Sequence, residues 1–290
     1  RLGDDGNYTL YTGSSDMGMG ANTILTQMAC EALGCPMESM TVVESDTDIV
    51  PFDPGSYASS TTYVTGTAAK MAAEELREKI IHKLAQFMEV KPEDIDFDGL
   101  VGVTKDGTKK MSIQELAPKL LVGTTCEQLT GFATWGSHTS PPPFMASIAE
   151  VKVDKQTGQI IPLHMYNCVD CGTVVNPKLA RVQVEGGAVQ AIGMALYEDV
   201  RYSSNGRLET NNFMTYKIPT RQDIGELHTA FVESYEESGA YGVKSIGEIV
   251  INTACPAIQH AVKNAVGADI RTLPMTPEKV FMGMDEKYKV

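Results

Sequence analysis

Three consecutive prolines near the middle of the chain constrain its fold more than any other feature. They end a stretch, residues 131–143, that also contains serine and threonine. Proline has no backbone N–H to donate and interrupts helices and sheet ladders, so such a stretch is typical of a linker. We therefore expect two lobes, one over residues 1–135 and one over residues 144–290. A chain of 290 residues is long enough to give each lobe an apolar core.

In the first expected lobe, hydrophobic spacing predicts a long amphipathic helix over residues 62–88. Apolar side chains recur there at intervals of three and four, which places them on one helix face. A shorter helix is expected over residues 23–33, ended by Gly34. Strands are expected over 7–12 and 41–44 and around the turns at 98–99 and 106–107, and a capping box at 112–115 opens another helix.

The second expected lobe combines strands and helices without a regular alternation. Strands are expected over 147–153 and 159–169 and in a hairpin over 202–208, and helices over 181–197 and 251–266. A doubly wound parallel sheet would need strands and helices in turn along the chain. The sequence therefore favours an α+β fold, with two mixed-sheet lobes against which helices pack.

Composition and charge exclude several classes of partner. The formal net charge of −13 repels phosphate backbones and acidic membrane surfaces, so we expect no nucleic-acid and no membrane partner. No apolar run approaches the roughly 20 residues that span a bilayer. Six cysteines in a chain of this length do not suggest the disulfide framework of a small secreted domain. We therefore expect a reducing, cytoplasmic setting.

Metal ligands are not evident along the sequence. The five histidines form no His-x-x-x-His pair, and Cys168 and Cys171 form the only Cys-x-x-Cys. A structural zinc site would need two more thiolates or histidines at suitable spacing. We therefore expect no metal held by protein side chains, and a redox role for the cysteine pair stays open.

Glu248 is the strongest candidate for chemistry. It lies between glycine and a run of valine and isoleucine, within residues 239–258, where a helix is expected to begin. A carboxylate held among apolar side chains loses hydration, which disfavours its charged form and makes it a usable base near neutral pH. The alternative is structural: Ser245 and Glu248 have the spacing of a capping box, which satisfies free amides in a first helical turn.

Two further segments have the residue types of an anion-binding site. Gly18 and Gly20 allow a close approach of the backbone, and the expected helix just after them offers free amides. Residues 55–62 combine glycine with hydroxyl side chains directly before the long helix. The alternative for this second segment is a helix N-cap, and both roles can coexist at one helix start.

Four segments, in order along the chain, resemble the xanthine dehydrogenase type of molybdenum hydroxylase. Residues 13–27, with Asp16-Met-Gly-Met-Gly20, are similar to its first pterin-binding stretch, and residues 46–62 to its second. Residues 170–190 are similar to its third, and the glutamate segment, closing with residues 273–280, to its fourth. The resemblance covers nearly the whole chain. It implies the fold of the C-terminal half of a molybdopterin-binding domain.

The resemblance implies that the chain binds molybdopterin, as such or as its cytosine dinucleotide, and that Glu248 is the catalytic general base. Since the dithiolene of the pterin holds the molybdenum, protein ligands to the metal are not required. The residues implied to contact the cofactor are Gly18, Met19, Gly20, Ala58, Ser59, Ser60 and Gln190. Two positions depart from the family pattern, because Met19 replaces the usual glutamine and Ile249 replaces a frequent proline. Methionine offers only a weak acceptor, whereas backbone contacts at position 19 are unaffected.

The implied reaction is the oxidative hydroxylation of a purine or another N-heteroaromatic at an electron-poor carbon, with water as the oxygen source. Glu248 would remove a proton from the water-derived oxygen. Aldehyde, nicotinate and aromatic-thioester members of the family remain alternatives. A cofactor-free scaffold or assembly fragment is the alternative from another class.

The resemblance also implies partners for the chain. The N-terminal part of a molybdenum subunit is expected to complete the cofactor cleft, so the chain alone is expected to be inactive. The 2Fe-2S and FAD centres are expected on partner subunits or domains, because one Cys-x-x-Cys cannot supply four cluster ligands. The family commonly has an Asp-Cys-Gly turn at the position of Cys171, which favours a structural role for this cysteine.

Overall fold

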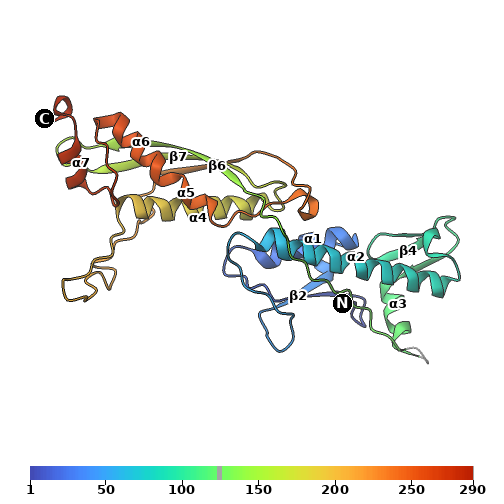
Figure 1. Ribbon diagram of the computed structural model, residues 1–290. Coiled ribbons are helices and arrows are strands. Elements are labelled where there is room, and N and C mark those ends of the chain that lie inside the picture. The colour runs from blue at the N-terminus through green and yellow to red at the C-terminus, as the bar shows by residue number, and fades with distance from the viewer. Residues whose placement is uncertain (123–125, 290) are drawn as a thin grey trace. The chain divides into compact units, whose positions relative to one another are not determined.

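The computed structural model describes residues 1–122 and 126–289, and the chain divides into two compact units (Figure 1). The first unit comprises Arg1–Pro141 with Tyr235–Ser245, and the second comprises Pro142–Ser234 with Ile246–Val290. Residues 235–245 were expected in the second lobe, but they belong to the first unit. Hydrogen bonds explain this placement, since Ser245 Oγ accepts the N–H of Tyr63.

Two helices, α1 (Ala21–Leu33) and α2 (Thr61–Met88), form the centre of the first unit. They approach so closely that a Cβ on Gly66 of α2 would lie 2.7 Å from the side chain of Met28. Leu76, Ile80 and Leu84 of α2 are fully or almost fully buried in the core of this unit. These three residues follow the spacing from which the sequence predicted the helix.

Two small sheets complete the first unit. Its strands are β1 (Tyr8–Thr12), β2 (Met40–Glu44), β3 (Ile95–Phe97), β4 (Val101–Thr104) and β5 (Lys110–Ser112). β1 and β2 pair in parallel, whereas β3, β4 and β5 form an antiparallel sheet in that order. α3 (Ile113–Leu120) begins with the expected capping box at Ser112. Short 3-10 turns lie at Met37–Ser39 and Pro92–Asp94.

A three-stranded sheet and the helices on one of its faces form the second unit. β6 (Phe144–Val153) and β7 (Ile160–Asp170) are antiparallel, and β8 (Glu226–Phe231) pairs in parallel with β7. α4 (Pro177–Leu196) and α6 (Ala254–Val266) share an apolar core with the inner face of this sheet. The outer face exposes the large side chains of Phe144, Ile148 and Tyr166.

The last long helix is divided in two, contrary to the single helix predicted over residues 251–266. α5 (Ile249–Asn252) and α6 are separated at Thr253. Pro256 explains the break, because it has no N–H to donate to the carbonyl of Asn252. Pro256 lies in the first turn of α6, as expected. α7 (Pro277–Gly283) and 3-10 turns at Ala240–Gly242 and Glu286–Tyr288 are the remaining elements.

Open sheets of both parallel and antiparallel type, with helices packed on them, confirm the predicted α+β class. In the described part of the chain, no helix has the length and apolarity that crossing a membrane requires.

Candidate functional site

The glycine turn before α1 is organised by Asp16. One oxygen of its carboxylate accepts the N–H groups of Gly18 and Gly20, at 2.9 and 3.1 Å, and the other accepts the N–H of Asn22 at 3.2 Å. The amides at this helix start were expected to be free for an anionic ligand. That expectation is wrong for these three groups, because a carboxylate of the chain itself already occupies them.

The charge of Asp16 is stabilised by the same contacts. Partial burial raises the pKa of Asp16, but backbone N–H groups, first those of Gly18 and Gly20, outweigh burial and hold the pKa below its ordinary value. A negative group at the N-terminus of α1 also interacts favourably with the helix dipole. The turn is therefore held in a fixed shape at neutral pH.

Around this turn the structure leaves polar atoms and space available. Ser14 Oγ and Asn22 Oδ1 are buried and have no hydrogen-bond partner among the described residues. Gly18 has a φ of 103°, and a Cβ added there would meet nothing within 4 Å. Met19 is half-buried. A ligand could therefore approach the backbone at Gly18 and supply partners for the two buried atoms.

The hydroxyl-rich loop before α2 has a strained backbone. Ala58 and Ser59 both adopt the left-handed conformation, with φ of 51° and 52°. Each such residue costs about 1 to 2 kcal/mol when it is not glycine, and such outliers concentrate at ligand sites. Ser60 occupies the N-cap position of α2, but its hydroxyl donates to the carbonyl of Tyr57 and does not cap the helix. Of the four residues that could supply the N-cap, Ser59, Ser60, Thr61 and Thr62, the structure therefore excludes Ser60 as a side-chain cap.

The glycine turn and the hydroxyl-rich loop lie side by side within the first unit. Ser56 Oγ donates to the carbonyl of Ser15 at 3.3 Å. Gly13 packs directly against Pro51, where a Cβ would overlap the carbonyl oxygen. The structure thus brings together two segments that are about 40 residues apart, as a shared binding surface would require.

Part of the glutamate segment joins the same unit. Ser245 Oγ accepts the N–H of Tyr63, in the first turn of α2, at 3.1 Å. Tyr241 donates its hydroxyl to the carbonyl of Met28 at 3.0 Å, and burial raises the pKa of Tyr241 and keeps this donor protonated. Ser245 therefore caps α2 rather than the helix that follows it.

Glu248 lies in the second unit, directly before α5. It occupies the N-cap position without a side-chain cap, so the capping box proposed for Ser245 and Glu248 does not form. Its side chain is exposed, although apolar burial was expected. The apolar burial at this helix start falls on Val250, which packs inward against Gly187 of α4, and not on Glu248.

The helix α4 contributes a residue that was not among the predicted site residues. Gln183 donates its side-chain amide to the carbonyl of Gly247 at 3.3 Å, next to Glu248. Gln190, which was singled out, is exposed on the same helix. The sequence could have indicated Gln183 through its spacing, because it lies four residues before Gly187 and therefore on the same face of the helix.

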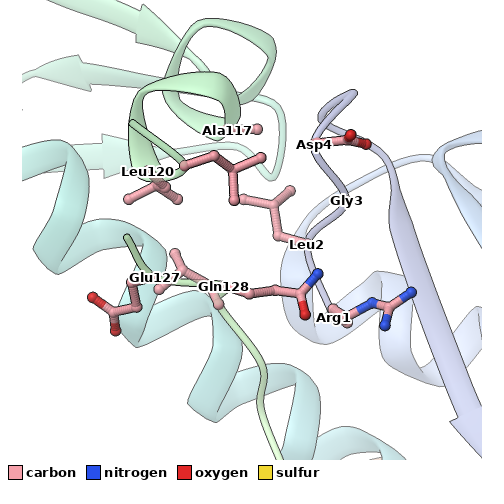
Figure 2. Close-up of a pocket in the computed structure, with 10 residues that line it drawn as sticks. Arg1, Leu2, Gly3, Asp4, Ala117, Leu120, Glu127 and Gln128 are labelled. Carbon is pink, nitrogen blue, oxygen red and sulfur yellow. The ribbon is translucent and has the colours of Figure 1, made fainter. Parts of the chain in front are cut away.

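The predicted site residues are thus divided between the units. Gly18 to Gly20 and Ala58 to Ser60 lie in the first unit, whereas Gln190 and Glu248 lie in the second. A separate pocket of about 220 Å³, shown in Figure 2, is lined by the first residues of the chain, by the end of α3 and by residues 127–129. None of the predicted site residues is among those that line it.

Comparisons with known proteins agree on one family. The model of a molybdopterin cofactor-binding domain matches residues 1–225. A probable hypoxanthine oxidase of Escherichia coli (strain K12) is 37% identical over 290 residues, covering 99% of this chain and 30% of that protein. A putative xanthine dehydrogenase molybdenum-binding subunit of the same strain is 34% identical over 285 residues, covering 97% of this chain and 38% of that subunit. The chain thus spans about a third of the length of these curated relatives.

Solved structures show the same fold. Quinoline 2-oxidoreductase from Pseudomonas putida 86 matches with a TM-score of 0.86 at 27% identity, covering 99% of this chain and 38% of that one. The carbon monoxide dehydrogenase from Oligotropha carboxidovorans matches with a TM-score of 0.86 at 24% identity, covering 97% of this chain and 36% of that one. These matches confirm the resemblance that the four sequence motifs indicated.

Proposed function

Since the chain belongs to the molybdopterin cofactor-binding domain family of the xanthine dehydrogenase type, we propose that it forms part of an oxidoreductase active site. The proposed reaction is the hydroxylation of a purine or another N-heteroaromatic at an electron-poor carbon, with water as the oxygen source. The similarity to a hypoxanthine oxidase along nearly the whole chain is the observation that carries this proposal. The likeness to quinoline 2-oxidoreductase supports the same class of substrate, since quinoline is also an N-heteroaromatic.

The residues of the first unit fit a pterin cofactor. Ser14 and Asn22 each hold a buried polar atom without a partner in the described chain, and open space lies beside Gly18. The strained backbone at Ala58 and Ser59 is a second feature expected of a ligand site. We propose that Gly18 to Gly20 and Ala58 to Ser60 bind molybdopterin, or its cytosine dinucleotide, mainly through backbone groups. When bound, this group supplies the two-electron oxidation.

In this proposal Glu248 acts as the general base. Its exposed carboxylate is accessible, and it would accept the proton of the water-derived oxygen that is transferred to the substrate. Gln183 is proposed as a positioning residue for Glu248, because its hydrogen bond to the Gly247 carbonyl fixes the backbone next to Glu248. Gln190 is proposed as a further cofactor contact, offered by its exposed amide on α4.

Other polypeptide segments would complete this active site. The relatives are about three times as long as the chain, and one of them is described as a molybdenum-binding subunit. Met17, Phe52 and Tyr57 flank the glycine turn and the hydroxyl-rich loop with large exposed apolar surfaces, as expected where another segment docks. We propose the N-terminal part of a molybdenum subunit as this partner, with 2Fe-2S and FAD centres on further subunits or domains, in the cytoplasm.

Oxidation assays test the proposed reaction. The protein purified together with its natural neighbours should oxidise hypoxanthine or quinoline and insert oxygen from isotopically labelled water. Benzaldehyde serves as the comparison substrate. Oxidation of the aldehyde alone would contradict the proposed substrate class and favour the aldehyde branch of the family. An assembly that contains neither molybdenum nor pterin would contradict the proposal entirely and favour a scaffold role.

A further inference from the structure

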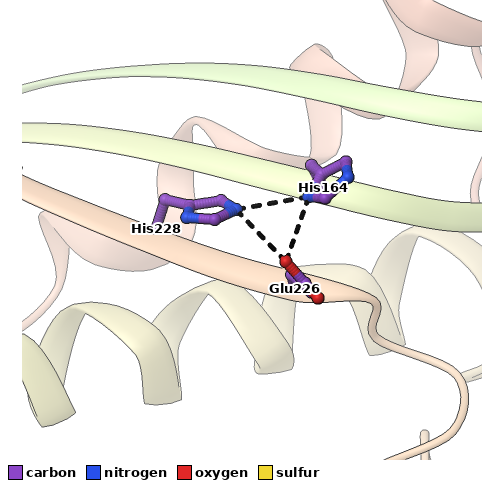
Figure 3. Close-up of side chains that lie close together, drawn as sticks. All are labelled: His164, Glu226 and His228. Carbon is purple, nitrogen blue, oxygen red and sulfur yellow. Dashed lines mark hydrogen bonds and ion pairs between the residues drawn. The ribbon is translucent and has the colours of Figure 1, made fainter.

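Three side chains with metal-binding atoms converge on the outer face of the second-unit sheet. Figure 3 shows His164 of β7 and His228 and Glu226 of β8 pointing toward one another. His164 Nδ1 lies 3.2 Å from His228 Nε2 and 3.6 Å from Glu226 Oε2. The distance between His228 Nε2 and Glu226 Oε2 is 3.9 Å. None of these residues has a part in the proposed redox function.

The strand register explains why distant residues meet here. β7 and β8 are parallel, and His164 pairs directly with Glu226 while Tyr166 pairs with His228. Residues two apart on a strand lie on the same face, so Glu226 and His228 both lie beside β7 on its outer side. The histidines are 64 positions apart, which is why ligand spacing along the chain did not reveal the cluster.

The geometry suits a small divalent cation. A triangle with sides of 3.2, 3.6 and 3.9 Å has a point that is about 2.1 Å from all three corners, within the usual Zn–N and Zn–O range of about 2.0 to 2.2 Å. Two imidazole nitrogens and one carboxylate oxygen are also a common donor set for zinc. Without an ion, the contact between the two histidines is a single hydrogen bond whose direction depends on the tautomer.

Neighbouring groups hold the donors in place. The ring of Tyr166 stacks on that of His228, with centroids 4.6 Å apart and an angle of 12° between the planes. Glu150 of β6 pairs with His164 from the other side, on the same outer face, and adds negative charge near the cluster. Stacking limits the rotation of His228, so less conformational freedom is lost when an ion binds.

We propose that His164, Glu226 and His228 bind a divalent transition-metal ion of the zinc type, with solvent as the fourth ligand. The ion links β8, which follows the long connection over residues 197–225, to the centre of the sheet. This site is independent of the molybdopterin cofactor, and its role is to fix β8 at the edge of the sheet.

Metal titration tests the site. The full 290-residue chain, washed with a chelator, is titrated with Zn²⁺ by calorimetry and with Co²⁺ by visible absorption. We expect saturable binding of one ion per chain and Co²⁺ bands typical of low coordination number. His228→Ala and Glu226→Gln should each weaken binding by about tenfold or more. Bound Zn²⁺ should also raise Tm, because an ion that binds only the folded state stabilises it.

Matched variants exclude binding to other surface groups. His260→Ala on α6 and Glu278→Gln on α7 remove an exposed histidine and an exposed carboxylate elsewhere in the same unit, and they should leave the affinity unchanged. Far-UV circular dichroism checks that every variant is folded. The site is refuted if no saturable binding is seen, or if folded His228→Ala and Glu226→Gln both bind Zn²⁺ as the unchanged protein does.

Discussion

At the scale of single residues, two carboxylates have opposite environments. Asp16 is surrounded by backbone donors and fixes the glycine turn, whereas Glu248 presents its carboxylate at the surface of the second unit. Asp16 lies four residues before Gly20, the N-cap residue of α1, so its hydrogen bonds to this turn became evident only in the structure. Asp16 thus has a structural role in the glycine turn, whereas the general-base role of Glu248 is our proposal.

Replacing Asp16 with alanine should lower the free energy of unfolding by about 1 kcal/mol at neutral pH, the usual cost of losing a helix cap. The pKa of Asp16 is lowered in the folded protein, so this stabilisation is fully present above the unfolded value of about 3.9. It is lost as the pH falls through the folded pKa. Urea unfolding at pH 7, and at the lowest pH where both proteins stay folded, measures the difference.

The control for this prediction is Asp96→Ala, which removes an exposed carboxylate from β3. It should change stability by no more than about 0.5 kcal/mol. A difference between wild type and Asp16→Ala that is the same at both pH values would show that charge has no part in the cap.

Glu248→Gln should abolish most turnover in the assembled enzyme while leaving its molybdenum and pterin content unchanged. Glutamine keeps the shape of the side chain but cannot accept the proton, and losing a general base typically lowers rates by about a hundred to ten thousand fold. Steady-state kinetics and metal analysis on the same preparation measure both effects. Glu278→Gln is the control, and near-normal turnover in Glu248→Gln would remove Glu248 from the mechanism.

At the scale of elements, contacts between segments decide how helices begin. The N–H of Tyr63 in the first turn of α2 donates to Ser245, 182 positions away, and Ser60 at the N-cap position provides no side-chain cap. α5 begins at Ile249 without a side-chain cap from Glu248. Val250 of α5 packs on Gly187 of α4, and Gln183 of α4 hydrogen-bonds to Gly247 just before α5. Local capping signals therefore misassigned Ser60 and Ser245, since each hydroxyl hydrogen-bonds elsewhere.

Two neighbouring glycines on α4 should respond differently to alanine. A Cβ on Gly187 would overlap Val250, so Gly187→Ala should lower the free energy of unfolding by about 1 to 3 kcal/mol. A Cβ on Gly186 would meet nothing within 4 Å, so Gly186→Ala should raise it by up to about 1 kcal/mol through helix propensity. Thermal and urea unfolding of both variants check this. Equal effects in the two variants would mean that α5 does not pack on Gly187.

At the scale of the whole molecule, the chain forms two units that the backbone connects at three points. The backbone passes from the first unit to the second near Pro141, returns at Tyr235 and leaves again after Ser245. The proposed cofactor contacts at Gly18 to Gly20 are in one unit, and Glu248 is in the other.

The chain produced alone should contain little molybdenum or pterin, whereas the chain produced with its natural neighbours should contain both. The physical reason is that a cleft missing part of its wall leaves a polar cofactor partly hydrated and weakly bound. Metal analysis and pterin fluorescence on the two preparations measure the difference. Full cofactor content in the chain alone would show that the 290 residues form the complete binding site.

The sequence by itself determined the helices and strands of strong periodicity, the α+β class and the family. These depend on local spacing and on short ordered motifs, such as the apolar repeat within residues 62–88 or the glycine turn at Gly18. Burial of one face gives hydrophobic residues a period of 3.6 in a helix and of 2 in a strand. These periods appear in the sequence itself, so they predict elements without coordinates.

Only the tertiary structure decided which polar groups hydrogen-bond to one another and which side chains are buried. It placed residues 235–245 with the first unit, paired Ser245 with α2, left Glu248 exposed and brought His164 to His228. Hydrogen-bond partners and burial depend on segments that are far apart along the chain, and no local spacing encodes them.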